Sequence, residues 1–473
     1  MSQDTPSTAM SATNDPTKAP THSPSGHHRV VITGMGWITP LGHDIDTAWD
    51  KLLNAQSAIG PVTRFDASTC STNFAAEVTD FSLHEHLGER ANAHDHAGVG
   101  TQFALAATSQ AWKMAKLDTA PPNLKRTGIY LGAGEGVLDY PPYMAANIAG
   151  WDHENRKLNT VDWVTKAYEG MAPMAEIEQE PQLASTHIAA ELGTMGPTLN
   201  CMTACAASTQ AIGEAFEIIR RGDADIMIAG GCHSMIHPLG MTGFMRLTAM
   251  STRRDDPSTA SRPFDNSRDG FVMGEGAGIL ILESLESALK RGANILAEVA
   301  GFGSTADAYR ITDIHPDGKG GAGAMAAALE QAGIDPSATD EAGRPLVHYI
   351  SAHGTGTQEN DKTESNGVRS VFKDLAPQVP FSSIKSMMGH LIQAAGAVEL
   401  ITCIQAIQTG ILPPTANLND LDPNCGLDHV PNEARDTNTP DGKGGKGGVD
   451  VCLSNSFGFG GQNDTICIRK FVG

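Results

Sequence analysis

The stretch that decides the fold is LNCMTACAASTQAIGEAFEIIRRGDADIMIAGG, residues 199–231. Its central part repeats apolar side chains at the spacing of one buried helix face. These side chains are Ile212, Ala215, Phe216 and Ile219. Two arginines and then Gly222 end the predicted helix. The apolar run DADIMIAGG that follows predicts a buried strand. Helices that alternate with short apolar strands indicate an α/β fold with buried sheets.

Working outward, the same pattern recurs on both sides of this stretch. Further strands are predicted within 29–36, 127–136, 277–283, 346–357 and 449–461. The strand 346–357 runs into a turn of small residues, as 127–136 does, so we expect an internal duplication. The predicted boundaries are a disordered tail at 1–28, an N-terminal half at 29–290 and a C-terminal half at 291–473. Residues 139–183 are predicted as a surface excursion, a lid or a dimer contact, and 436–448 as a flexible hairpin tip.

Composition excludes several classes of function. The 473 residues carry 33 Lys+Arg against 54 Asp+Glu, a net charge of −21, which disfavours binding to nucleic acid or to an anionic membrane. No apolar run approaches the length of a membrane span, and residues 1–28 lack the apolar core of a signal peptide. The eight cysteines form no CxxC pair, so we expect reduced thiols in the cytoplasm and no metal site.

The glycine-rich turns do not match nucleotide-binding patterns. GMGWIT (34–39) lacks the third glycine of the dinucleotide fingerprint, and GAGEGV (132–137) breaks its spacing. The phosphate-binding motif G-x-x-x-x-G-K-[ST] does not occur. We therefore expect no nucleotide cofactor, and indeed no cofactor of any kind.

Cys205 is the candidate nucleophile. Counting back from Ile212 places it at the start of the predicted helix, where free N–H groups and the helix dipole stabilise a thiolate. The alternative is a buried, inert cysteine in a turn of small residues, which is the interpretation we give to Cys201.

Two histidines and a lysine complete the candidate site. His353 follows an apolar strand in SAHGTGT (351–357), the place where α/β folds position their chemistry. His390 is predicted in the first turn of a buried helix, kept neutral by the helix dipole and by Lys385. Glu399 lies in the same apolar stretch and needs a partner, for which Lys385 is the candidate. For either histidine alone, a structural role is the alternative.

Taken together, the ordered motifs carry a family resemblance. They are TACAAS around Cys205, HGTGT after His353, SIKSMMGH with Lys385 and His390, and NSFGFGG (455–461). The set resembles the elongating β-ketoacyl-[acyl-carrier-protein] synthases of type II fatty-acid synthesis and the related polyketide ketosynthases. The resemblance extends from about Arg29 to the C-terminus, through VVITGMGWITPLG and RDGFVMGEGAG.

The resemblance implies a thiolase-like fold of two pseudo-symmetric βαβαβ halves in an α-β-α-β-α core, active as a homodimer. It also implies an acyltransferase that joins malonyl-acyl-carrier protein to an acyl group on Cys205, with loss of CO₂. His353 and His390 would stabilise the enolate, and Lys385, with Glu399, would orient the site. By resemblance, Phe457 shares the oxyanion hole with Cys205, and Phe459 is a gate for the acyl chain. Thr312, Thr355 and Thr357 would contact the pantetheine arm.

The His/His pair with Lys385 separates the chain from initiating synthases, which pair one histidine with an asparagine. Two alternatives stay open: a ketosynthase of a polyketide or other specialised acyl pathway, and a non-catalytic partner subunit. The cysteine at 205 argues against the second.

Several positions depart from the family pattern. Glu135 stands at the floor of the acyl pocket, where a carboxylate predicts shorter or polar acyl primers. Arg310 replaces the usual histidine. Ala91-Asn92 and Thr248 replace basic residues that dock the acidic carrier protein, so other arginines must supply the docking patch. The candidates are Arg220, Arg221, Arg246 and Arg254.

Overall fold

The computed structural model describes residues 19–134, 139–310, 314–438 and 448–472. Its centre is one ten-stranded sheet with the strand order β12-β11-β15-β16-β10-β1-β9-β8-β4-β7. The N-terminal strands are β1 (Val30–Ile38), β4 (Thr127–Gly132), β7 (Thr198–Cys201), β8 (Ile226–His233) and β9 (Gly276–Ser284). The C-terminal strands are β10 (Ala297–Ala306), β11 (Tyr349–Ser351), β12 (Phe381–Ser382), β15 (Val451–Gly458) and β16 (Gln462–Arg469).

The strand order confirms the internal duplication. The two halves meet where β1 pairs with β10, Val30 opposite Val299. Outward from this junction, each half places its first, fifth, fourth, second and third strand, as β1-β9-β8-β4-β7 and as β10-β16-β15-β11-β12. The pairings also agree: the inner two are antiparallel and the outer two parallel in both halves. A shared topology of this kind is what the thiolase-like fold requires.

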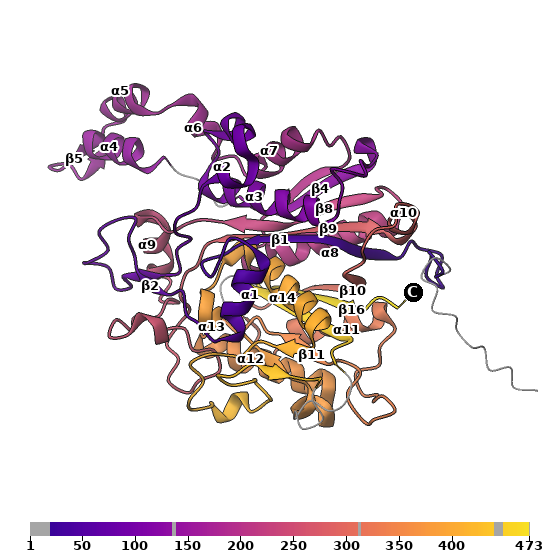
Figure 1. Ribbon diagram of the computed structural model, residues 1–473. Helices are drawn as coiled ribbons and strands as arrows, with labels where there is room; N and C mark the ends of the chain where they lie inside the picture. Colours follow the sequence, from indigo (N-terminus) through magenta and orange to yellow (C-terminus); the bar gives the residue numbers. More distant parts are fainter. Residues whose placement is uncertain (1–18, 135–138, 311–313, 439–447, 473) are drawn as a thin grey trace, which may run out of the picture.

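Helices cover both halves of the sheet and fill the space between them (Figure 1). Helix α3 (Val99–Met114) packs on β1 and β9 from outside, and α11 (Lys319–Ala332) packs on β10 and β16. Between the halves lie α8 (Ala207–Arg220) and α14 (Ala395–Thr409), which contact strands of both halves. The two central helices touch so closely at Gly396 that a Cβ there would lie 1.8 Å from Oγ1 of Thr209. The five layers predicted from the resemblance are therefore present.

The remaining helices surround this core. They are α1 (Ile45–Leu53), α2 (Leu83–Leu87), α7 (Leu183–Leu192), α9 (Pro238–Arg246), α10 (Leu285–Lys290), α12 (Gln358–Phe372) and α13 (Lys385–Met388). Short 3₁₀ helices are η2 (Gly88–His94), η3 (Leu124–Arg126), η4 (Ala204–Ala206), η5 (Pro257–Thr259), η6 (Lys373–Gln378), η7 (Ile392–Ala394) and η8 (Pro423–Cys425). Three short strand pairs are β2 (Gly60–Pro61) with β3 (Phe74–Ala75), β5 (Trp151–Asp152) with β6 (Lys157–Leu158), and β13 (Ile411–Leu412) with β14 (Arg435–Asp436).

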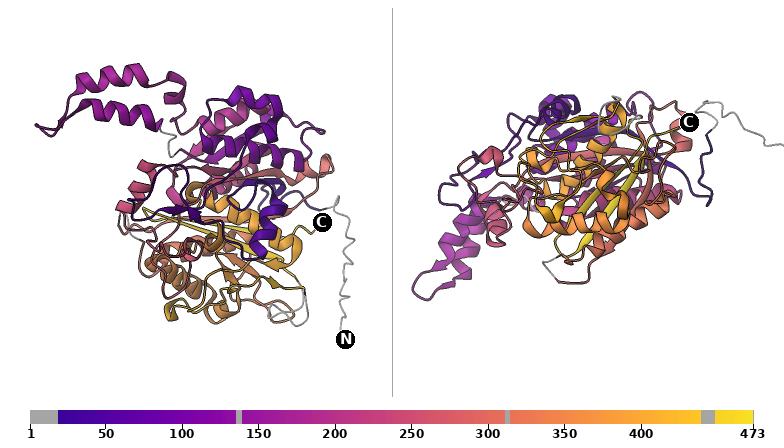
Figure 2. Two further views of the ribbon diagram at one scale, coloured as in Figure 1. Left: turned by 60° about the vertical axis from the view of Figure 1, so that its left-hand side comes forward. Right: turned by 90° about the horizontal axis from the view of Figure 1, so that it is seen from below.

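The excursion at 139–183 forms a projecting arm. It consists of α4 (Tyr140–Gly150), the β5–β6 hairpin, α5 (Thr160–Gly170) and α6 (Pro173–Ile177). Figure 2 shows the α4–α5 pair standing away from the rest of the molecule. Helix α5 presents Val161, Val164 and Tyr168 on one face at helical spacing, and Tyr168 is 92% exposed. The arm therefore offers an apolar face without a partner among the described residues.

At the N-terminus, residues 19–28 of the predicted tail lie along the body. Arg29 N donates to Thr21 O at 2.9 Å, and His28 N donates to Arg220 O at 3.1 Å. Of the predicted flexible tip 436–448, only residues 436–438 and 448 belong to the described chain. Among the described helices, none combines the length and the apolar composition that crossing a membrane would need.

Candidate active site

Cys205 lies at the point where strand β7 turns into helix α8. The 3₁₀ turn η4 holds it, and α8 begins two residues later, close to where the periodicity predicts. The preceding residue, Ala204, has φ 48°, a left-handed conformation that costs energy in a residue with a Cβ. The side chain of Cys205 is buried at 4% exposure and lies under the end of β15, where Gly458 packs on the same turn.

The C-terminal half repeats this turn and adds an insertion that carries functional residues. Turn η7 again starts on a left-handed residue, Ile392 (φ 43°), and leads into α14, so Gln393 occupies the position that corresponds to Cys205. Between β12 and η7, however, the second half inserts residues 383–391, where the first half has only Met202 and Thr203. Both Lys385 and His390 belong to this insertion.

One sequence prediction about His390 is wrong. It does not lie in the first turn of the long helix, because α14 begins only at Ala395. Gly389, with φ +69°, ends α13, and His390 is extended, with its N–H donating to Val272 O at 2.7 Å. The sequence predicts one helix from His390 onward because apolar residues follow without interruption, whereas Ile392, with φ 43°, and the turn η7 separate His390 from α14.

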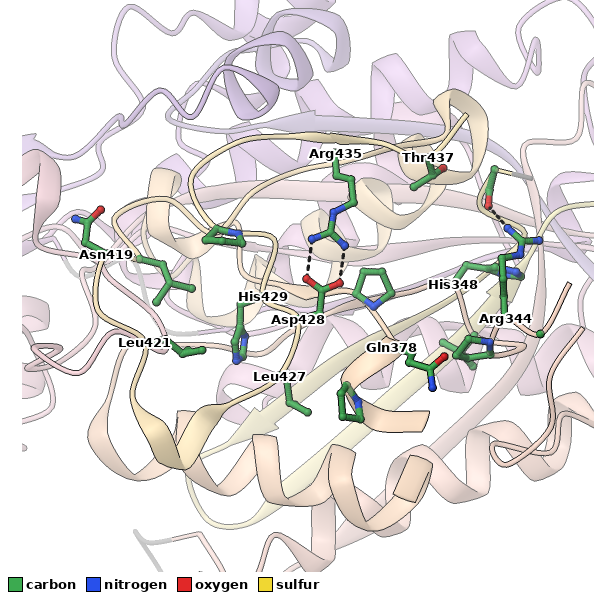
Figure 3. Close-up of a pocket in the computed structure, with 18 residues that line it drawn as sticks. Arg344, His348, Gln378, Asn419, Leu421, Leu427, Asp428, His429, Arg435 and Thr437 are labelled. Carbon is green, nitrogen blue, oxygen red and sulfur yellow. Dashed lines mark hydrogen bonds and ion pairs between the residues drawn. The ribbon is translucent and has the colours of Figure 1, made fainter. Parts of the chain in front are cut away.

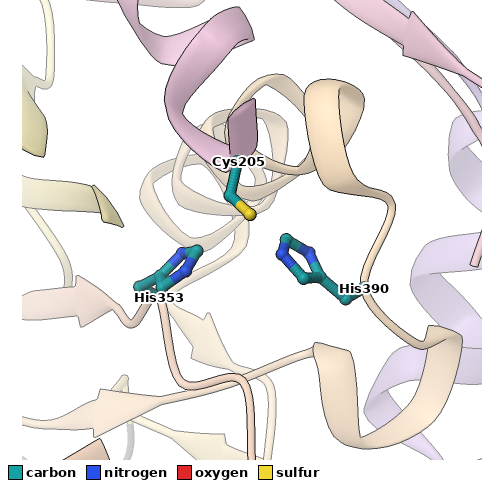
Figure 4. Close-up of side chains that lie close together, drawn as sticks. All are labelled: Cys205, His353 and His390. Atoms are coloured by element: carbon teal, nitrogen blue, oxygen red, sulfur yellow. The ribbon is translucent and has the colours of Figure 1, made fainter. Parts of the chain in front are cut away.

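The two histidines and the cysteine converge on one small space. A ligand-type atom of each of Cys205, His353 and His390 lies within 4.8 Å of the other two, and all three residues are buried. The two imidazole rings stand edge to face, with centroids 5.4 Å apart. Figure 4 shows both rings directed at the sulfur. A single carbonyl group placed here could contact all three side chains.

Both imidazoles are neutral in the folded protein. Burial, and secondly the positive charge of Lys385, holds the pKa of His353 and of His390 well below the ordinary value. Nδ1 of His390 accepts a hydrogen bond from Ile392 N at 3.3 Å, which assigns the ring proton to Nε2. Nε2 is buried and has no hydrogen-bond partner among the described residues. It is therefore a donor available to an oxygen that develops negative charge above Cys205.

Lys385 and Glu399 form the buried ion pair that the sequence predicts. Lys385 Nζ contacts Oε1 of Glu399 and also donates to His353 O at 2.6 Å. Burial raises the pKa of Glu399 to about 7, against the opposing effect of the lysine. Lys385 thus joins the insertion to the loop that carries His353, which fixes the distance between the two histidines.

Sequence reasoning missed the carboxylates of α12 beneath the His353 loop. The N–H groups of His353 and Gly354 donate to the two oxygens of Glu364, both at 2.8 Å. Asp361 accepts from Gly356 N at 3.1 Å and lies 3.4 Å from the buried Arg268. The signal was available, because Asp361 and Glu364 are three residues apart and so share one helix face.

A cavity of about 720 Å³ connects Cys205 to the surface. Phe457 and Phe459 line it, with Phe457 buried and Phe459 40% exposed. Thr355 and Thr357 line it as well, with their hydroxyl oxygens 3.0 Å apart. These four predicted site residues therefore share the space that leads to the nucleophile. The other two predicted contacts, Glu135 and Thr312, lie outside the described residues.

The arginines proposed for carrier docking separate into two groups. Arg246 ends α9, next to Leu247 and Thr248 at the cavity. Arg254 lies on the connection that follows, where it donates to Ser71 O at 3.2 Å. Arg220 and Arg221 end α8, roughly 20 Å along the helix from Cys205, and bind Glu217 and Asp223. Arg310 lines the cavity itself, with its guanidinium over the ring of Tyr309.

A second cavity, of about 790 Å³, lies in the C-terminal half away from Cys205 (Figure 3). Its two arginines are already paired: Arg435 with Asp428 of the lining at 2.5 Å, and Arg344 with Asp340, outside the lining, at 2.8 Å. The lining residues include none of the predicted site residues. We therefore place the chemistry at Cys205.

Cysteine and histidine are also the ligand types of a soft divalent cation. The ammonium of Lys385 opposes such an ion, since it already disfavours positive charge on both imidazoles. That the site uses no metal remains a prediction.

Two duplicated halves around one sheet, with a buried thiol at a strained helix start that faces two neutral imidazoles, define an α/β protein of the thiolase-like class. The family models agree with this description. The N-terminal domain of beta-ketoacyl synthase matches residues 27–288, and its C-terminal domain matches residues 296–419. The chain therefore belongs to the beta-ketoacyl synthase family.

Individual relatives are similar over nearly the whole chain. The 3-oxoacyl-[acyl-carrier-protein] synthase 2 of Staphylococcus aureus (strain COL) is 40% identical over 448 residues, covering 94% of this chain and 99% of the relative. The synthase 2 of Synechocystis sp. is 41% identical over 444 residues, covering 94% and 98%. Among solved structures, a beta-ketoacyl synthase from Burkholderia phymatum has TM-score 0.77 at 31% identity, covering 94% and 99%. A type II polyketide ketosynthase in complex with its acyl-carrier protein has TM-score 0.79 at 31% identity, covering 94% and 100%.

Proposed function

We propose that this protein condenses malonyl-acyl-carrier protein with an acyl group on Cys205, giving 3-oxoacyl-acyl-carrier protein in fatty-acid elongation. The convergence of Cys205, His353 and His390 in one buried space carries the proposal. Overall, a carrier protein loaded with an acyl thioester, a carrier protein loaded with a malonyl thioester and one proton are consumed. The products are the 3-oxoacyl-loaded carrier protein, CO₂ and a carrier protein with a free thiol. No cofactor is required.

In the first half-reaction the Cys205 thiolate attacks the acyl thioester carbonyl. The S–C bond to Cys205 forms, the bond to the carrier sulfur breaks, and that thiolate leaves and takes up a proton. The N–H groups of Cys205 and Phe457 hold the carbonyl oxygen of the tetrahedral intermediate. Phe459 moves to admit the acyl chain.

In the second half-reaction malonyl-carrier protein occupies the same cavity. The bond to its carboxylate carbon breaks, CO₂ leaves, and the electron pair forms an enolate whose oxygen accepts hydrogen bonds from His353 and His390. The enolate carbon then attacks the Cys205 thioester, which forms the C–C bond and returns the thiolate. Lys385 and Glu399 hold the two histidines at the required separation. Thr355 and Thr357 bind the pantetheine arm.

Sequence identity to the relatives favours a role in fatty-acid elongation over a role as a polyketide ketosynthase. The relatives called 3-oxoacyl-[acyl-carrier-protein] synthase 2 are about 40% identical, whereas the polyketide ketosynthase complex is 31% identical. A non-catalytic partner subunit would need neither the thiol nor the imidazole pair.

The carrier protein docks at the cavity mouth, where Arg246 and Arg254 supply positive charge. All eight cysteines lie among the described residues and none forms a disulfide, which fits a reducing cytoplasm.

Intact mass spectrometry tests the proposal directly. When it is incubated with acyl-loaded carrier protein, the protein should gain the mass of one acyl group, and a Cys205→Ala variant should not. Cys201→Ala is the matched control, because burial raises the pKa of that thiol to about 12 and its acylation is not expected. With malonyl-carrier protein added, the 3-oxoacyl product and CO₂ should appear in equal amounts. Equal acylation of the Cys205→Ala variant would contradict the proposal.

We also propose that the active species is a homodimer joined along β7. This strand ends the ten-stranded sheet and leaves backbone groups unpaired, and Leu199 on it is 45% exposed. The base of the arm lies at the same edge, because Pro181 and Met202 both approach Gly134. A two-fold pairing of β7 would let each arm lay its apolar face on the other subunit.

Light scattering after size exclusion tests the dimer. Leu199→Lys places a charge on the proposed interface and should give a monomer. Leu421→Lys is the matched control, since this leucine is 39% exposed and lines the second cavity, in the C-terminal half. A Leu199→Lys protein that stays dimeric would remove β7 from the interface.

A further inference from the structure

Methionines are concentrated around the nucleophile. The chain has 18 methionines, and five of them belong to the apolar cluster that includes Cys205. These five, which we call the methionine cluster, are Met235, Met241, Met245, Met250 and Met273. Helix α9 turns Met241 and Met245 to the same side, because they are four residues apart. The thiol therefore borders both the cavity that leads to the surface and this apolar cluster, and Phe271 belongs to both.

The order of the two half-reactions decides where the acyl chain goes; this step rests on the proposed function. The first carrier arm delivers the acyl group through the 720 Å³ cavity, and the malonyl arm must use the same cavity afterwards. The acyl chain on Cys205 has to leave this space before the second substrate binds. Its apolar tail then has the apolar cluster as its neighbour, because Cys205 is a member of that cluster.

The cluster is already packed in the free protein. Met241 and Met273 are fully buried, and Met250 is 3% exposed. The rings of Phe244 and Phe271 meet edge to face at 5.7 Å, and Phe271 meets His390 at 5.5 Å. Protein interiors have few voids, so a bound acyl chain must displace side chains. Methionine can give way for a short chain because its three side-chain torsions rotate, but each further methylene needs more displacement.

We propose that Met241 and Met250 limit the length of the acyl group that Cys205 accepts, so that this enzyme elongates short acyl chains. The same preference was expected from Glu135, and the methionine cluster supports it through different residues. A methionine truncated to alanine loses three heavy atoms of its side chain. Such a variant should admit an acyl chain longer by a few methylenes.

Acylation rates with a series of acyl-carrier proteins test this inference. The donors are acetyl, butyryl, hexanoyl, octanoyl and decanoyl, and the readout is acyl mass on Cys205 with time. For the wild type, the rate should fall by about tenfold or more for each methylene beyond the accepted length. In Met241→Ala, Met250→Ala and the double variant, the octanoyl-to-butyryl rate ratio should rise by at least about tenfold.

Two further variants distinguish an effect on the accepted acyl length from a general loss of packing in the protein core. Met35→Ala removes the same atoms from a different core, at a residue of β1 that is 4% exposed, and should leave the ratio unchanged. Met241→Leu keeps the volume and should retain the wild-type profile. The wild-type profile tests the inference even where an alanine variant fails to fold.

The inference is overturned if the wild type takes octanoyl as fast as butyryl. It is overturned equally if the double variant keeps the wild-type ratio. Failure of every donor to acylate Cys205 would instead overturn the proposed function, and the inference with it.

Discussion

Replacing His390 should separate the two half-reactions. In the folded protein its Nε2 proton points into the space above Cys205, because Nδ1 accepts from Ile392 N at 3.3 Å. Removing one preorganised donor from a developing oxyanion lowers rates by about 10²–10³-fold, which corresponds to about 2.7–4 kcal/mol. His390→Ala should therefore slow CO₂ release from malonyl-carrier protein by that factor. Acylation of Cys205 uses backbone donors and should change by less than about tenfold.

Two measurements on the same variants check this separation. Acyl mass on Cys205 reports the first half-reaction, and CO₂ released in a single turnover of the acylated enzyme reports the second. His390→Asn keeps a side-chain N–H and should recover part of the loss. The alanine variant also leaves a cavity beside Phe271 and His353, which costs about 2–4 kcal/mol of stability, so urea unfolding must show that it is folded. If acylation and CO₂ release fall equally in the alanine variant, the role assigned to His390 is refuted.

Three further predictions follow from the buried groups. Burial lowers the pKa of His429 from 6.5 to about 4, so between these pH values only the unfolded chain binds a proton at this residue. The free energy of unfolding should therefore decrease as the pH is lowered from 6.5 to 4, by up to about 1.4 kcal/mol per pH unit. In urea titrations, His429→Phe should flatten this dependence. Glu399→Ala leaves the Lys385 ammonium buried without its partner and should cost about 3–5 kcal/mol, whereas an unfolding midpoint close to wild type would mean that the pair is dispensable. Gln393→Cys in a Cys205→Ala background should gain no acyl mass, although the two positions correspond; any acylation at 393 would show that the turn alone suffices.

Local patterns were enough to predict the scaffold. Helix periodicity predicts Cys205 at a helix start, and in the structure α8 begins two residues later. The prediction works because the apolar face of the helix and the glycine that ends it both lie within about 20 consecutive residues. The apolar strands were likewise found at β1, β8, β9 and β15. These features depend on neighbours in the sequence, which a single chain displays directly.

The parts that were missed depend on distant contacts or on a single dihedral angle. His390 is predicted in a helix because an uninterrupted apolar stretch follows it, and only the left-handed Ile392 and the turn η7 break that stretch before α14. Glu364 belongs to none of the sequence motifs, yet it is buried at 2% exposure beneath the His353 loop. Its pKa, raised to about 7 by burial, follows from that tertiary contact. The spacing of Asp361 and Glu364 indicates a shared helix face, but the contact of that face with the His353 loop cannot be seen in the sequence.

The duplicated fold explains why the chemistry is asymmetric. Both halves build the same left-handed turn before a central helix, so both could present a side chain at Cys205 or at Gln393. Only the second half carries the inserted residues 383–391, and these bring Lys385 and His390 to the interface between the halves. Strand β11 of that half ends next to His353. The first half therefore supplies Cys205, the proposed nucleophile, and the second supplies the two imidazoles. Neither half alone holds a complete site, so the chemistry requires the two halves to pack together.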